Sequence, residues 1–335
     1  AALHLATLAL GIGKGDEILT TPISFLATSN AALYVGARPV FCDVEYSTAN
    51  ILVSSLKKFI NRPRVKAIYP VHFGGLPCDM PAIHKMARSR GLHIIEDACH
   101  ALGARYEHNG TWHKVGSCVH SDMAVFSFHP VKHITTGEGG AITTNSKKLY
   151  ENLLSLRSHG IVRSLALSRR RGPWYYEMTH LGFNYRLTDI QAALGISQLK
   201  KLDRFVNRRR EIALAYDQAF QELPRVVIPA ESKGYRGAYH LYPLRIDFKK
   251  IGISRAMFMK ELQKDGVGTQ VHYIPIHTQP YYRQLGYRVC CPEAERYYAA
   301  TLSLPLFPKM TDRDVNQVIR TVSATLGKST LGCAL

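Results

Sequence analysis

Short apolar runs alternate with helix-length amphipathic stretches through the first 160 residues. The apolar runs are rich in β-branched residues and predict buried strands at 17–21, 40–44, 66–72, 92–97, 123–128 and 140–145. The helical patterns that lie between and after them predict helices at 25–36, 51–60, 79–91, 146–158, 187–200 and 202–222. Strands that alternate with helices indicate crossover units. We therefore predict an α/β fold whose large domain contains a mostly parallel central sheet.

A second, smaller α/β unit is predicted in the C-terminal part of the chain. Its pattern predicts strands at 240–248 and 267–275, and helices at 254–264, 293–300 and 311–326. The polar, glycine-containing stretch 229–238 is typical of a junction, so we divide the chain into a large domain, 1–228, and a small domain, 229–335. The least patterned segment, 161–177, predicts a long functional or mobile loop.

The composition gives the chain a strong positive charge. The 335 residues are 46% hydrophobic, which is enough for a large core, and 43 Lys and Arg face 25 Asp and Glu, a net charge of +18. The excess is uneven, since 16 − 11 gives +5 in residues 1–160 and 27 − 14 gives +13 in residues 161–335. Such a charge raises a nucleic-acid hypothesis alongside an enzymatic one.

The cysteines and histidines bear on the cellular compartment and on metal binding. Seven cysteines without a CxxC pair predict no disulfide framework and favour a reducing, cytoplasmic location. Fifteen histidines form no metal-ligand spacing, so we expect no metal. No apolar run reaches the roughly 18–20 residues that cross a bilayer, and no signal peptide is present, so we expect no membrane partner.

Two side chains at predicted strand ends are the candidates for chemistry. Asp97 follows the apolar run LHII, at the carboxyl end where open α/β sheets place their ligands, although it could instead cap the next short helix. Lys132 follows the strand MAVFSF, with Ser127 before it and small, flexible residues after it. A lysine in a packed crevice has a lowered pKa and becomes a nucleophile, whereas a lysine in a surface turn does not.

Three segments resemble the DegT/DnrJ/StrS family of pyridoxal 5′-phosphate (PLP)-dependent sugar aminotransferases. They are IIEDACHALGA (94–104), SFHPVKHITTGEGGA (127–141) and HLGFNYRLTDIQAALGISQLKKLD (180–203). The likeness runs from residue 1 to about 325 and implies the fold type I of PLP-dependent transferases. The segments TTPISF, RSHGI, HLYPL and QVHYIPIH are similar to one branch, the C4 aminotransferases of pseudaminic acid biosynthesis.

The resemblance implies a set of cofactor contacts. Lys132 would hold PLP covalently and then transfer protons, and Asp97 would pair with the pyridine nitrogen and keep it protonated. His100 stands where many relatives have Gln, and the pseudaminic branch is similar in having His. Ser127 would contact the phosphate, and Phe25 would stack on the ring unless it is a core aromatic.

Further residues would complete the site and its partners. Asn184 would reach the cofactor phosphate of a neighbouring subunit in a homodimer with shared active sites, unless it caps the next helix. His272 and Tyr273 are candidates for the sugar site, with Tyr273 alternatively a core aromatic; Glu138 and Arg186 are weaker candidates. The implied reaction moves an amino group from L-glutamate, which leaves as 2-oxoglutarate, to C4 of a UDP-linked 4-keto-6-deoxy-N-acetylhexosamine.

One departure from the family pattern concerns the beginning of the chain. In relatives, a Ser-Gly/Ala-Thr segment that binds phosphate directly precedes the helix corresponding to AALHLA, with which this sequence opens. We therefore expect a fragment that lacks several dozen residues and has an impaired affinity for PLP.

Other readings stay open or are disfavoured. Family members that act as 3-dehydratases replace the lysine by His, so Lys132 argues against that activity, whereas aminotransferases for other nucleotide-linked keto sugars remain alternatives. A basic nucleic-acid-binding regulator would rest on the arginine runs 169–171 and 208–210, but no recognition motif accompanies them. The run 208–210 lies in a helical pattern and predicts a solvated face, while 169–171 could meet a diphosphate.

Overall fold

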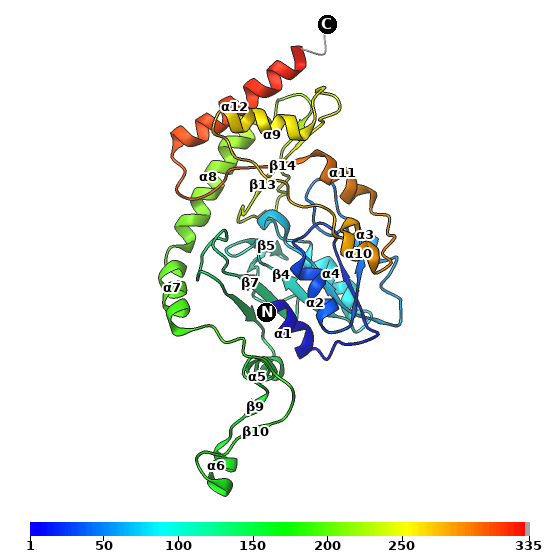
Figure 1. The fold of residues 1–335 in the computed structure, drawn as a ribbon, viewed down its shortest axis with the longest axis vertical. Helices are drawn as coiled ribbons and strands as arrows, with labels where there is room; N and C mark the ends of the chain where they lie inside the picture. Colours follow the sequence, from blue (N-terminus) through cyan, green and yellow to red (C-terminus); the bar gives the residue numbers. More distant parts are fainter. Residues whose placement is uncertain (332–335) are drawn as a thin grey trace.

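A six-stranded sheet forms the centre of the molecule in the computed structural model, which describes residues 1–331 (Figure 1). Its strand order is β2-β1-β3-β4-β7-β8, and all neighbours are parallel except the β7–β8 pair. The strands are β1 (Glu17–Thr20), β2 (Arg38–Phe41), β3 (Val65–Tyr69), β4 (His93–Asp97), β7 (Met123–Ser127) and β8 (Gly140–Thr143). All six strands were predicted from the apolar runs.

Helices cover both faces of this sheet, because alternate residues of each strand point to opposite sides. On one face, Ile95 packs in a core with the helices α1 and α5 and residues of α2; on the other, Ile94 packs in a core with residues of α3 and α4. The helices are α1 (Ala2–Ala9), α2 (Ala27–Tyr34), α3 (Val53–Leu56), α4 (Met80–Arg88) and α5 (Lys147–Leu156).

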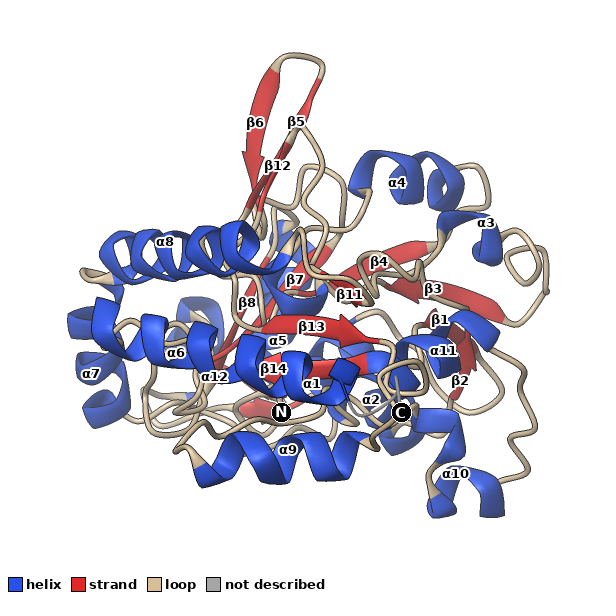
Figure 2. Ribbon diagram, turned by 90° about the horizontal axis from the view of Figure 1, so that it is seen from above, coloured by secondary structure: helices blue, strands red, loops and turns tan. Residues whose placement is uncertain are grey.

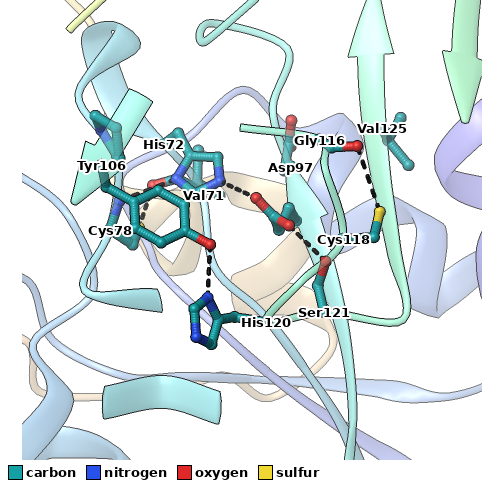
Figure 3. A network of polar contacts seen from close by, with 12 residues as sticks. Val71, His72, Cys78, Asp97, Tyr106, Gly116, Cys118, His120, Ser121 and Val125 are labelled. Carbon is teal, nitrogen blue, oxygen red and sulfur yellow. Dashed lines mark hydrogen bonds and ion pairs between the residues drawn. The ribbon is translucent and has the colours of Figure 1, made fainter. Parts of the chain in front are cut away.

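A buried polar network lies at β4, on the face of the sheet that α3 and α4 cover (Figure 3). The backbone N–H of Cys78 donates to Nδ1 of His72 at 3.0 Å, and Nε2 of His72 lies 2.8 Å from a carboxylate oxygen of Glu96. The hydroxyl of Ser121 donates to the other carboxylate oxygen of Glu96 at 2.5 Å. Asp97, the next residue, belongs to the opposite face.

The C-terminal part contains a second core around a three-stranded antiparallel sheet of order β11-β13-β14. The second half of α8 contributes Ile212, Tyr216 and Phe220 to this core. A division near residue 228 therefore stays a prediction, because α8 joins both parts. The elements are α7 (Asp189–Leu199), α8 (Leu202–Phe220), β11 (Val226–Val227), β13 (Tyr242–Ile246), α9 (Arg255–Lys264), α10 (Pro280–Gln284), α11 (Pro292–Ala300), β14 (Thr301–Leu304) and α12 (Asp312–Leu331).

The predicted strand at 267–275 is wrong. This segment is irregular and has a single bridge, between Gln270 and Ser303. It lies beside β14, a strand that the sequence analysis did not predict and that takes the place next to β13. The consecutive side chains His272 and Tyr273 both line a cavity, so the segment does not alternate between two faces as a strand does.

A hairpin stands out from the body of the protein and was also missed (Figure 2). It consists of β5 (Arg105–His108) and β6 (Thr111–Lys114), and β12 (Tyr235–Arg236) pairs with β5. Asn109 and Gly110 both have positive φ, 51° and 76°, as a type I′ turn requires. The Asn-Gly pair was therefore a usable sequence signal.

The predicted loop 161–177 has more structure than expected. It forms an arm that projects from the body, in which β9 (Ile161–Val162) and β10 (Glu177–Met178) pair antiparallel (Figure 1). Between them lies α6 (Leu165–Arg171), whose N-terminus is capped by the hydroxyl of Ser164. The sequence showed no long period here because the helix and both strands are short.

Candidate active site

A cavity of about 2950 Å³ opens at the carboxyl ends of β4 and β7. Residues from α1, α2, the 128–140 loop, the start of α8 and the segment 268–273 line it. Every predicted site residue except Asn184 belongs to its lining: Phe25, Asp97, His100, Ser127, Lys132, Glu138, Arg186, His272 and Tyr273. The fold thus brings together side chains that lie up to 248 positions apart in the sequence.

Lys132 is held in the tight turn that follows β7. Its backbone N–H donates to the carbonyl of His129 at 2.9 Å, and its Nζ lies 3.5 Å from Nε2 of His240. Burial lowers the pKa of Lys132, while neighbouring Cys99 and Asp97 act in the opposite direction. A lowered pKa increases the fraction of neutral, nucleophilic amine near neutral pH.

Asp97 ends β4 and presents its carboxylate at the cavity. One oxygen accepts a hydrogen bond from the hydroxyl of Thr28 at 2.6 Å, and the other from the backbone N–H of Cys99 at 3.2 Å. The carboxylate keeps further acceptor positions for a cationic donor. The alternative helix-capping role is wrong, because residues 98–104 form turns rather than a helix. Thr28 was missed, since only the tertiary structure brings it to Asp97.

Four imidazoles surround Lys132 and are held neutral. The rings of His100 and His240 lie 4.3 Å apart, and Nε2 of His100 is 3.3 Å from the hydroxyl of Tyr273. Burial, followed by the charge of Lys132, holds the pKa of His100 well below its ordinary value and lowers the pKa of His272 to about 4. Burial also lowers the pKa of His133 to about 3. His240 was quoted only within a motif, not as a site residue.

The remaining predicted residues lie nearer the solvent. Phe25 is 60% exposed, so it is not a core aromatic, and its ring centroid is 6.3 Å from that of Tyr273. Ser127 accepts a long hydrogen bond, 3.4 Å, from the backbone of His129. Glu138 and Arg186 are exposed lining residues: Glu138 lies 3.8 Å from His129, and Arg186 stands at the start of the stretch that leads to α7.

Asn184 lies outside the cavity lining and is exposed. Its backbone pairs with Ser158 in an isolated bridge. The alternative role as a helix cap is wrong, because Thr188 caps α7 and forms a capping box with Gln191. Asn184 is therefore exposed beside the cavity and does not cap α7, so its side chain is available to contact a neighbouring molecule.

The solvated face predicted for the arginine run 208–210 is wrong for its middle residue. Arg209 is only 3% exposed and donates to backbone carbonyls, including that of Leu306 at 2.8 Å. The helix α8 passes between the two cores, so its inward face includes a position that the sequence pattern assigned to solvent. The run 169–171, by contrast, lies in α6, which has no buried residue.

The donor set fits PLP. Lys132 supplies an amine for the aldehyde, Asp97 a carboxylate for a protonated pyridine nitrogen, and Ser127 a hydroxyl for phosphate. Nδ1 of His100 is buried and has no hydrogen-bond partner, so the cavity contains a polar atom that a bound ring substituent could satisfy. Within residues 1–331, no group of His, Cys, Asp or Glu is arranged to hold a metal ion.

The buried histidines around Lys132 should make the folded protein less stable at acidic pH. Because His133 has a folded pKa of about 3 and an ordinary value of 6.5, the unfolded chain binds more protons between these pH values. The free energy of unfolding should therefore fall as the pH drops below about 6.5, by on the order of 1.4 kcal/mol per pH unit for this residue. Urea unfolding at pH 6.5 and 5 should show a smaller fall for His133→Gln; equal falls in both proteins would contradict this assignment.

Comparison with known proteins agrees with this site. A family model for DegT/DnrJ/EryC1/StrS aminotransferases matches residues 1–323. An uncharacterized protein of Methanocaldococcus jannaschii is 44% identical over 333 residues, which are 98% of this chain and 84% of the relative. The spore coat polysaccharide biosynthesis protein SpsC of Bacillus subtilis is 43% identical over 327 residues, 96% of this chain and 82% of the relative.

Solved structures agree as well. Helicobacter pylori PseC, an aminotransferase involved in the biosynthesis of pseudoaminic acid, has a TM-score of 0.88 at 34% identity and covers 98% of this chain and 85% of its own. A PLP-form structure from Streptococcus pneumoniae has a TM-score of 0.87 at 28% identity, with coverage of 98% and 85%. These matches confirm the predicted α/β fold class and the predicted cofactor. The chain belongs to the DegT/DnrJ/EryC1/StrS aminotransferase family, and it is a PLP-dependent sugar aminotransferase.

Proposed function

We propose that this enzyme transfers the amino group of L-glutamate to C4 of a UDP-4-keto-6-deoxy-N-acetylhexosamine in the pseudaminic acid pathway. The observation that carries this proposal is the assembly of Lys132, Asp97 and His100 in one cavity, in a chain 34% identical to PseC. By the resemblance described above, His100 stands where many relatives have Gln and where the pseudaminic branch is similar in having His. Contacts with Tyr273 and His240 fix the position of this imidazole in the cavity.

The side chains of this chain divide the chemistry among them. PLP, when bound, supplies a protonated pyridine ring that withdraws electrons and makes the Cα proton of the donor amino acid acidic. Asp97, fixed by Thr28 and Cys99, supplies the negative charge for the ring nitrogen. Lys132, with its lowered pKa, holds the cofactor in the resting enzyme and removes the Cα proton from glutamate with its neutral Nζ.

The sugar side of the cavity carries neutral donors and acceptors. Nδ1 of His272 and the hydroxyl of Ser303 are 2.9 Å apart, which fixes the imidazole, and Tyr273 stands between the rings of Phe25 and His100. Neutral imidazole and phenol groups suit the hydroxyl and keto oxygens of a sugar, whereas Arg186 and Glu138, at the exposed rim, suit charged or polar groups of the nucleotide.

An assay of epimeric substrates tests the proposed function. The purified enzyme, glutamate and UDP-4-keto-6-deoxy-N-acetylhexosamines of either C5 configuration should give an amino sugar and 2-oxoglutarate, with preference for the β-L-arabino configuration of the pseudaminic pathway. Mass and NMR spectra identify the product. A clear preference for the other epimer would contradict the proposal. It would favour another nucleotide-linked keto sugar, an alternative that the 43% identity to SpsC keeps in view.

We further propose a homodimer with shared active sites. Helix α7 has no buried residue, and it exposes Ile190 and Ile196 to 85% and 61%. The arm, which precedes α7 in the chain, exposes Leu165 and Trp174 to 78% and 75%. Large apolar side chains exposed in this way mark surfaces that another molecule covers. The dimer would bring Asn184 to the cofactor phosphate of the second subunit.

Charged substitutions on α7 test the dimer. Ile190→Glu combined with Ile196→Glu should shift the protein to a monomer in sedimentation velocity, because the change buries two carboxylates in the interface. Tyr281→Glu, an exposed aromatic on α10 at the opposite side of the molecule, is the matched control and should leave the dimer intact (Figure 1). A dimer that survives both α7 substitutions would contradict this interface.

Hybrid dimers test whether the active sites are shared. Lys132→Ala and Asn184→Ala subunits should each be weakly active alone. Mixed in one dimer, they create one site with both defects and one intact site, so activity should recover. No recovery after verified subunit exchange would show that Asn184 does not act across the interface.

The proposed location is the cytoplasm. The cysteines among the described residues are all unpaired, as in proteins of a reducing compartment. No described helix is both long and apolar enough to cross a bilayer.

A further inference from the structure

Arg209 is a buried cation without an anionic partner. Its side chain lies on α8 and is 3% exposed, yet it forms no ion pair with any carboxylate within residues 1–331. Instead, Nη1 donates to the carbonyls of Leu306 at 2.8 Å, Tyr239 at 3.1 Å and His240 at 3.3 Å. Burying a charge without a counter-ion is costly, and the hydrogen bonds to the carbonyls offset part of this cost.

Two of the bonded carbonyls, those of Tyr239 and His240, belong to the segment that carries a contact of Lys132, whereas Leu306 follows β14. His133 donates from Nε2 to the carbonyl of Ala238 at 3.0 Å, so this segment is attached to the lysine loop as well as to Arg209. His240 places Nε2 3.5 Å from Nζ of Lys132, the outer limit of a hydrogen bond. The guanidinium therefore fixes the backbone of His240, whose imidazole lies within 3.5 Å of the reactive amine.

Every titratable group that faces His240 favours its neutral form. These groups are His100, whose ring centroid is 4.3 Å away at a tilt of 43°, Lys132, His133 and Arg209; none of them is an anion. Burial first, and these neighbours next, hold the pKa of His240 well below its ordinary value. Arg209 also lowers the pKa of His133. Burial lowers the pKa of Arg209 to about 10, so this guanidinium still carries its charge near neutral pH.

We propose that Arg209 is a positioning residue of the reaction, which fixes His240 against Lys132 and keeps the imidazoles of His133 and His240 unprotonated. The neutral imidazole can then accept a hydrogen bond from Nζ, and Lys132 is the group that ionises in the working pH range. This inference rests on the proposed role of Lys132, but the protonation of the two histidines is measurable without any activity.

NMR of the ring nitrogens in ¹⁵N-histidine-labelled holoenzyme tests the electrostatic part. His133→Gln and His240→Asn identify the two sets of signals. In the wild type, both imidazoles should stay neutral down to about pH 5. In Arg209→Gln, their titration midpoints should rise by about one pH unit, because the nearby charge is gone. Unchanged midpoints in a folded Arg209→Gln protein would overturn the proposal.

Arg208→Gln is the matched control. Arg208 precedes Arg209 on α8 and also donates to a backbone carbonyl, that of Met310 at 2.8 Å, but it pairs with Asp312 and faces outward. Its removal should leave both histidine midpoints unchanged. Equal shifts in Arg208→Gln and Arg209→Gln would mean that any loss of charge on α8 has the effect, and would overturn a specific role of Arg209.

Arg209→Lys distinguishes the effect of the charge from the effect of the hydrogen bonds. It also tests the positioning role if Arg209→Gln does not fold. The lysine keeps the charge, but its side chain is one atom shorter, so its ammonium does not reach the place of Nη1 between the three carbonyls. The midpoints should therefore stay low while kcat falls by about tenfold with KM unchanged. Wild-type kcat in Arg209→Lys would overturn the positioning role. Loss of activity in all proteins, wild type included, with the predicted NMR shifts would instead contradict the proposed function and leave this inference standing.

Discussion

Lys132→Ala should lower kcat by a factor of about 10³ or more, because it removes both the amine that holds PLP and the base that moves the Cα proton. Borohydride reduction of the yellow wild-type protein, followed by peptide mapping, should place a pyridoxyl group on the Lys132 peptide. The variant should give no adduct there, although PLP can still bind non-covalently through Asp97 and the phosphate contacts.

The matched control for this experiment is Lys147→Ala. Lys147 is exposed at the start of α5 and pairs only with Glu151, one helical turn away. It should keep full activity and full labelling of Lys132. A pyridoxyl adduct on another lysine of the active wild type would overturn the assignment of Lys132, as would a fully active Lys132→Ala protein.

Asp97→Asn has the second largest expected effect, a fall in kcat of about 10²–10³. The amide is almost the same size and can still accept the hydrogen bond from Thr28, but it carries no charge to keep the ring nitrogen protonated. The loss should therefore appear mainly in kcat, with a changed absorption spectrum of the bound cofactor and an unchanged unfolding midpoint in urea.

Asp189→Asn provides the comparison for Asp97. It neutralises an aspartate in the first turn of α7, outside the cavity lining, and should leave the spectrum and kcat as they are. If Asp97→Asn keeps the wild-type spectrum and rate, the pyridine nitrogen does not face this carboxylate, and the orientation of the cofactor proposed above is wrong.

The sheet and its two reactive ends were predictable because burial leaves a strong trace in the sequence. A central parallel strand is apolar on both faces, so the polar residue that ends it stands out, as Asp97 does after LHII. The resemblance to a known family then supplied roles for residues such as His272, which no local pattern would have singled out.

The features that sequence analysis missed depend on contacts between distant segments. Thr28 and His240 enter the site through partners 69 and 108 positions away, and nothing in their own surroundings indicates this. Arg209 looked like one of three solvated arginines, because a helix that passes between two cores has no single apolar stripe. The hairpin at 105–114 is different, since its Asn-Gly turn was visible and went unused.

The two adjacent acids of β4 show how narrowly this site is specified. Glu96 belongs to the buried network of His72 and Ser121, and Asp97 to the cavity, because successive side chains of a strand alternate. Deleting one residue earlier in β4 would move Glu96 to the place of Ile95 and Asp97 to the place of Glu96. The cavity would then lose the carboxylate at the strand end, and His72 would face a shorter acid. The strand therefore tolerates substitution at its apolar positions more readily than any change in its length.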